Sequence, residues 1–89
     1  RKERPFSVSE FERRLNVAIG QVEVCVATAE DTIIAKLEWA LAGESERQLR
    51  DVVGILEQSG EGLDRSYIDR WISELGLREL WERAQSQAE

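Results

Sequence analysis

The chain has 89 residues, of which 42% are hydrophobic and 34% charged, and its formal net charge is −6 at pH 7. This length suits one small domain, and the composition is that of a folded chain rather than a disordered one. The single cysteine excludes an internal disulfide, and the lack of histidine removes both a zinc-ligand set and the usual neutral-pH general base. No apolar run approaches the roughly 20 residues of a membrane-spanning helix, and the acidic balance argues against direct nucleic-acid binding.

The first predicted element is a short helix at 8–14. Ser7 and Glu10 match the S-x-x-E capping box that opens many helices. Phe6 before the cap and Phe11 after it match a hydrophobic staple.

The spacing of apolar residues then changes and predicts a β-hairpin at about 15–26. A two-residue loop at Gly20-Gln21 pairs the strands so that their aliphatic side chains share one face. These side chains are Leu15, Val17, Ile19, Val22, Val24 and Val26. Gly20 favours a type II′ turn. Because a two-stranded hairpin is only marginally stable alone, we expect helices on this face and further strands beside it.

Four helices are predicted to follow. The first covers 29–42, with Thr28 and Asp31 as its capping signature and Gly43 at its end. A second covers 46–58 after a short turn. Asp64 caps a third helix that Gly76 ends, and a last helix covers 77–86. The apolar stripes that should form the core are Ile33, Leu37, Ala40 and Leu41; Leu49, Val52, Val53 and Leu56; Tyr67, Ile68, Trp71, Ile72 and Leu75; and Leu77, Leu80, Trp81 and Ala84.

These elements predict a mostly helical α+β chain. It comprises a short N-terminal helix, the hairpin, and a four-helix C-terminal bundle that packs on one face of the hairpin. Residues 1–28 hold the first helix and the hairpin, and residues 29–89 form the helical module. The whole is expected to be a single domain or a fragment of a longer protein, and the chain contains no methionine.

A candidate binding site lies on the first two helices of this module. Lys36 is on the first, and on the second Arg47 and Asp51 are i,i+4 neighbours, with Arg50 adjacent. A short connection makes the two helices antiparallel neighbours, so Lys36 and Asp51 can approach across the seam. One interpretation is a phosphate-binding lysine held by an aspartate, with an arginine assisting. The other is ordinary surface charge with an ion pair that contributes about 0.3–0.5 kcal/mol.

Three other features leave alternatives open. Glu30 and Asp31 could be paired carboxylates, although acids in a first turn also suit the helix dipole. Trp39 could floor a base-stacking pocket, contact a partner or cover the hairpin. Cys25 falls on the less apolar face of its strand, where we expect a covered thiol rather than a nucleophile, since no base accompanies it.

Residues 22–84 resemble the C-terminal part of bacterial nucleotidyltransferase-fold proteins related to the toxins of abortive-infection toxin–antitoxin systems. The resemblance rests on the order and spacing of its motifs. They are a short strand, T-A-E-D-T-I-I-A-K-L at 28–37, S-E-R-Q-L-R-D-V at 45–52, L-D-R-S-Y-I-D-R-W at 63–71 and E-L-G-L at 74–77. Two positions depart from the pattern: Ala29 stands where proline is usual, and Leu49 where tryptophan is common.

The resemblance implies that Lys36 contacts a nucleotide phosphate, with Asp51 beside it and Arg50 and Arg47 as candidate supports. It also implies that the intact protein uses Mg²⁺ and a nucleoside triphosphate, and that the hairpin forms the margin of a larger sheet. The Gly-Ser and D-x-D motifs of such enzymes are absent from this chain. We therefore expect no catalytic residue, metal site or activity in these 89 residues, and a missing N-terminal nucleotidyltransferase half as partner.

An alternative is an independent protein–protein interaction module that oligomerises through the hairpin edge. In either case the lone cysteine favours a reducing, cytoplasmic setting, with no membrane contact. The substrate and the acceptor are not encoded in any motif.

Overall fold

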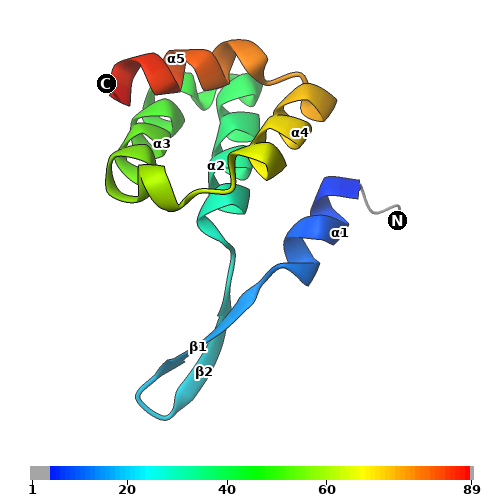
Figure 1. The fold of residues 1–89 in the computed structure, drawn as a ribbon, viewed down its shortest axis with the longest axis vertical. Coiled ribbons are helices and arrows are strands. Elements are labelled where there is room, and N and C mark those ends of the chain that lie inside the picture. Colours follow the sequence, from blue (N-terminus) through cyan, green and yellow to red (C-terminus); the bar gives the residue numbers. More distant parts are fainter. Residues whose placement is uncertain (1–4, 89) are drawn as a thin grey trace.

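The computed structural model describes residues 5–88 and confirms a mostly helical α+β chain with one antiparallel hairpin (Figure 1). The first part contains α1 (Pro5–Glu12), β1 (Leu15–Ile19) and β2 (Val22–Val26). The helical part contains α2 (Ala29–Trp39), a π-helical turn η1 (Ala40–Glu44), α3 (Ser45–Ser59), a 3₁₀ turn η2 (Gly60–Gly62), α4 (Arg65–Leu75) and α5 (Arg78–Ala88). No helix within residues 5–88 combines the length and the apolar character needed to cross a bilayer.

The N-terminal helix begins earlier than predicted. It starts at Pro5, so Ser7 lies inside α1 rather than at its cap. Proline suits a first helical turn because its fixed φ is already helical and its missing N–H has no partner there. Phe6 is buried edge-to-face against Trp71, with the ring centroids 5.4 Å apart, whereas Phe11 is exposed. The two phenylalanines therefore do not form the predicted staple, and Phe6 instead anchors α1 to α4.

The predicted hairpin register is confirmed. Leu15 pairs with Val26, Val17 with Val24, and Ile19 with Val22. Gly20 has φ 64°, and no residue other than glycine in the described chain has a positive φ. A positive φ at the first loop position alone is that of the predicted type II′ turn.

The apolar face of the hairpin is largely exposed, in contrast to the expected cover of helices. Figure 1 shows the two strands extending away from the helical part, which meets the hairpin only near its base. Ile19 and Val22 at the tip are 64% and 61% exposed. The prediction of a covered thiol is also wrong, since Cys25 is exposed and its Sγ donates to Asn16 Oδ1 at 3.0 Å.

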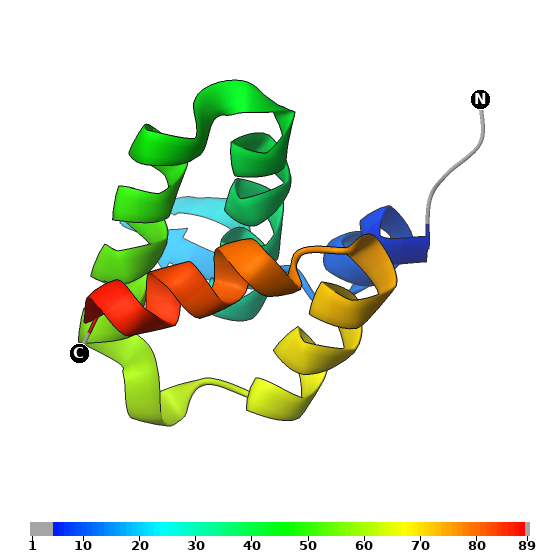
Figure 2. The same ribbon diagram turned by 90° about the horizontal axis from the view of Figure 1, so that it is seen from above.

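The helical module packs around α2, which lies between α3 and α4, while α5 packs across α3 (Figure 2). Two predicted caps are confirmed. The Thr28 side chain accepts from the Asp31 backbone N–H, and the Asp64 side chain accepts from the Tyr67 backbone N–H. Gly43 has φ 130° and turns the chain between α2 and α3.

The core agrees with most of the predicted stripes. The buried apolar residues are Phe6, Ile33, Ile34, Leu37, Ala40, Leu49, Val52, Leu56, Leu63, Ile68, Trp71, Ile72, Leu77, Leu80, Trp81 and Ala84. Leu41 was predicted to be buried, but it is exposed. It lies in the segment Ala40–Glu44, where Gly43 with φ 130° interrupts the helix, so the regular stripe of α2 does not continue through this segment. Ile34 is buried although it lies outside the predicted stripe, because α2 is covered on two sides.

Candidate functional site

The structure brings Lys36 and Asp51 together, as the spacing predicts. Lys36 Nζ lies 3.0 Å from Asp51 Oδ2 across the seam between α2 and α3. The lysine side chain is 29% exposed and the aspartate side chain 47% exposed. An ion pair this open to water contributes about 0.2–1 kcal/mol to stability.

The pair lies in a shallow surface hollow of about 330 Å³. Its lining residues are Lys36, Arg50, Asp51, Gly54, Ile55 and Gln58. The described residues that line it include Arg50, as predicted, but not Arg47. Lys36, Arg50 and Asp51 together carry one net positive charge, on a chain whose formal net charge is −6.

The chemistry of the hollow suits a small anion. An ammonium group has three N–H donors, and Asp51 accepts from one of them. An arginine beside it adds a planar set of donors that can match two phosphate oxygens. The aspartate holds the lysine in one position, which reduces the entropy lost when a ligand binds.

Gly54 has no structural explanation within the chain. It lies in the interior of α3, where glycine is about 0.5–1 kcal/mol less favourable than alanine. A Cβ atom at this position would meet no other atom within 4 Å, so no close packing requires its absence. Because Gly54 lines the hollow beside Asp51, the missing side chain keeps this part of α3 open to an approaching group.

Trp39 does not share the hollow of Lys36. It is exposed, and it lines a second hollow of about 500 Å³ with Phe6 and Glu10 of α1 and residues of α2 and η1. Its neighbours there come from α1, α2 and η1 and not from the hairpin, so the structure does not place Trp39 as a cover for the hairpin. Base stacking and partner contact both stay open.

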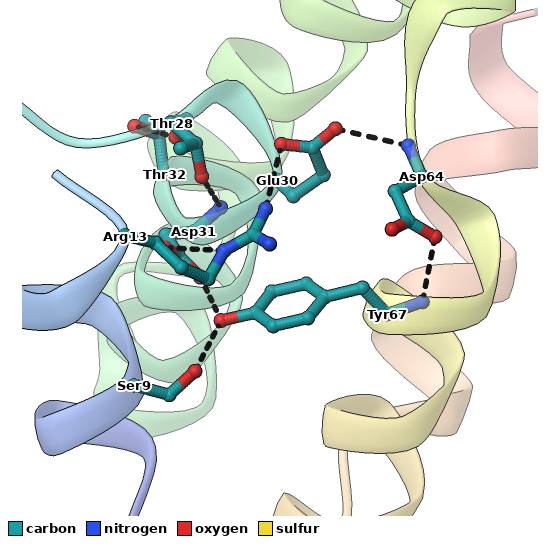
Figure 3. A network of polar contacts seen from close by, with 8 residues as sticks. All are labelled: Ser9, Arg13, Thr28, Glu30, Asp31, Thr32, Asp64 and Tyr67. Atoms are coloured by element: carbon teal, nitrogen blue, oxygen red, sulfur yellow. Dashed lines mark hydrogen bonds and ion pairs between the residues drawn. The ribbon is translucent and has the colours of Figure 1, made fainter. Parts of the chain in front are cut away.

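A partly buried polar cluster that the sequence did not reveal joins α1, α2 and α4 (Figure 3). Asp31, at the start of α2, is completely buried. Its Oδ1 accepts a short hydrogen bond from the Tyr67 hydroxyl, and its Oδ2 accepts from Arg13 Nε at 3.3 Å. The guanidinium of Arg13 lies 3.7 Å from the centre of the Tyr67 ring, and Ser9 Oγ lies 2.9 Å from the Tyr67 hydroxyl.

Glu30 extends this cluster to the start of α4. One of its carboxylate oxygens pairs with Arg13 Nη2 at 3.2 Å, and the other accepts from the Asp64 backbone N–H at 2.9 Å. The two neighbouring acids are thus held by one arginine and by backbone and hydroxyl donors. Their arrangement fixes the base of the hairpin to the helical module, and it favours a structural role over paired catalytic carboxylates.

The pKa of the Tyr67 hydroxyl reports on this cluster. Burial raises the pKa of its hydroxyl above the usual 10.0, and the hydrogen bond to Asp31 adds to the rise, although Ser9 and Arg13 act in the opposite direction. Because the neutral phenol is favoured in the folded state, its contribution to stability is complete below pH 10 and is lost as the pH rises through the folded pKa.

We therefore expect the tyrosinate absorbance of the native chain to rise with a midpoint above 10.0, and that of the urea-unfolded chain to rise near 10.0. Tyr67 is the only tyrosine, so the signal belongs to this residue alone. The Tyr67→Phe variant is the blank for the absorbance and should show a flatter loss of stability above pH 10. Equal midpoints in the native and unfolded chains would contradict this account.

Across residues 5–88, no three His, Cys, Asp or Glu side chains are grouped so that they could hold a metal ion. The described residues therefore offer no clustered ligand set for the Mg²⁺ that the resemblance implies for an intact enzyme. Comparisons with protein-family models, curated proteins and solved structures found no match to this chain.

Proposed function

We propose that this chain is the C-terminal helical module of a nucleotidyltransferase-like protein and that the hollow beside Lys36 binds nucleotide phosphates. In this proposal the carboxylates that hold Mg²⁺ belong to the nucleotidyltransferase half, and the module is inactive alone. No transfer step is assigned to the residues of this chain. The intact protein would move a nucleotide to an acceptor in the cytoplasm.

The observation that carries the proposal is the ion pair between Lys36 and Asp51 in a hollow that Gly54 keeps open. An exposed ion pair with no ligand needs no glycine beside it. A phosphate group approaching α3 does need that space, and it gains from a lysine already fixed in position. The resemblance independently assigns the phosphate contact to Lys36.

Each residue then has a distinct role. Lys36 donates its remaining N–H groups to phosphate oxygens, and Arg50 supplies the second positive charge. Asp51 positions Lys36 and does not contact the phosphate, because two anions repel each other. The surrounding negative charge of the chain disfavours loose anion binding, so an anion should bind at this hollow before any other surface.

Equilibrium dialysis with radiolabelled ATP tests the proposal. We expect weak but saturable binding, and Lys36→Ala should weaken it at least tenfold because the central phosphate contact is lost. The matched control is Arg78→Ala, which removes the cation of another exposed ion pair, formed with Asp69 at 2.7 Å, and should change affinity less than twofold. Equal affinities for the two variants would contradict the assignment of Lys36.

Substitution of Gly54 separates stability from binding. We expect Gly54→Ala to raise the free energy of unfolding by about 0.5–1 kcal/mol, because alanine is the better helix former and its Cβ meets no atom. The same change should weaken ATP binding, because it fills part of the hollow. Urea unfolding and dialysis measure the two effects. A more stable variant with unchanged affinity would show that the glycine does not serve the ligand.

The gene upstream of Arg1 gives a second, independent test of the parent protein. The proposal predicts a Gly-Ser motif followed by D-x-D in the same reading frame, because those residues hold the metal in the proteins that this chain resembles. A start codon directly before Arg1 would contradict it.

A further inference from the structure

The two outer edges of the hairpin differ in chemistry. In an antiparallel pair, residues alternate between those that bond to the neighbouring strand and those whose backbone groups point outward. A two-residue turn makes Ile19 and Val22 a bonded pair, so Ala18 on β1 and Glu23 on β2 point their backbone groups outward. By the same alternation, Asn16 and Cys25 also belong to the outward set.

Only one of these edges carries a charge. Glu23 places a carboxylate on the edge of β2, and charged side chains protect strand edges from pairing with other chains. The edge of β1 carries Asn16 and Ala18, neither of which is charged. The side-chain carbonyl of Asn16 is turned to Cys25 Sγ on β2, at 3.0 Å, so it does not occupy the β1 edge.

The size of the apolar face decides what can cover it. Five-residue strands are about 17 Å long and each occupies about 5 Å of the width of the sheet, so the face of the two strands measures about 170 Å². A stable interface buries about 800 Å² on each partner. Two copies meeting through this face alone would bury too little, and the net charge of −6 on each copy would oppose them.

We infer that the outer edge of β1 pairs with an unpaired strand of a larger β-sheet, and that the apolar surface of this same partner covers the exposed face of the hairpin. Edge pairing supplies backbone hydrogen bonds, and the sheet beyond the new strand supplies the area that the hairpin lacks. This inference does not depend on nucleotide binding, because Lys36 and Asp51 lie on α2 and α3.

Matched proline variants test which edge is used. Proline removes an outward N–H without breaking a bond between β1 and β2 at Ala18 or at its cross-strand partner Glu23. The probe is a fluorescently labelled heptapeptide of alternating threonine and valine, followed by anisotropy with the whole chain. Because the peptide supplies an edge strand without a sheet beyond it, we expect weak but saturable binding, which Ala18→Pro weakens at least tenfold and Glu23→Pro changes less than twofold.

Two further measurements make the result decisive. Asn16→Pro blocks the same edge at a second position and should weaken peptide binding as Ala18→Pro does, while circular dichroism confirms that the variants keep their helices. Light scattering over a range of concentrations should report a monomer. Absence of saturable binding, equal effects of Ala18→Pro and Glu23→Pro, or a dimer that resists dilution would each overturn the inference.

Discussion

Replacing Asp31 with alanine should lower the free energy of unfolding by about 3 kcal/mol, at the lower end of the range for breaking a buried charged pair. Asp31 is completely buried and accepts from both Tyr67 and Arg13. Its removal leaves the Tyr67 hydroxyl and the Arg13 guanidinium without the carboxylate that accepts their hydrogen bonds. The loss stays at the lower end because Arg13 keeps Glu30 and remains 32% exposed, so water can solvate part of its charge.

Urea unfolding followed by tryptophan fluorescence measures this effect, and Asp69→Ala is the matched control. Asp69 also pairs with an arginine, Arg78, but its side chain is 61% exposed. We expect Asp69→Ala to change stability by less than about 0.5 kcal/mol. Equal losses for the two variants would show that the cluster around Asp31 does not hold α1, α2 and α4 together.

Replacing Ile34 with alanine should also cost about 3 kcal/mol, because the side chain is fully buried between helices and its removal leaves a cavity. Leu41→Ala is the control on the same segment. Leu41 is exposed, so its truncation should change stability by less than about 0.5 kcal/mol. The spacing of apolar residues predicts the reverse, with the larger loss of stability at Leu41. Urea unfolding of both variants measures which loss is larger. A larger loss for Leu41→Ala would contradict the structure of η1.

Local patterns in the sequence predict the hairpin and the starts of α2 and α4 well. Alternating aliphatic residues around Gly20 determine the strand register, since a shift of one residue would divide the aliphatic side chains between two faces. The caps at Thr28 and Asp64 follow from short-range side-chain chemistry. The contact of Lys36 with Asp51 follows from helical spacing and a short connection between two helices.

Features that depend on distant residues could not be predicted in this way. Tyr67 and Asp31 meet only because α4 packs against α2, and nothing in either local sequence indicates the other. Phe6 is buried against Trp71 of α4, and no local pattern around Ser7 indicates that contact. Leu41 was misplaced because the chain kinks at Gly43, so the regular helical period does not continue through Ala40–Glu44.

The exposed hairpin face has a different cause. Its six aliphatic side chains satisfy every local rule for a half-buried strand pair, and the predicted helices exist, yet they lie elsewhere in the molecule. A periodic pattern shows that a face is apolar and does not show what covers it. The helices bury their own stripes against one another and leave the apolar face of the hairpin uncovered. We infer that the sheet of a partner covers it.

Mapping of backbone amide chemical shifts during a titration of the whole chain with ATP tests the central claim most directly, since it locates the bound nucleotide. We predict saturable shifts concentrated at Lys36, Arg50, Asp51 and Gly54, which weaken as salt screens the phosphate charge and which Lys36→Ala removes. Shifts confined to other surfaces, or no saturable shift in the wild-type chain, would contradict the assignment of this hollow as a nucleotide site.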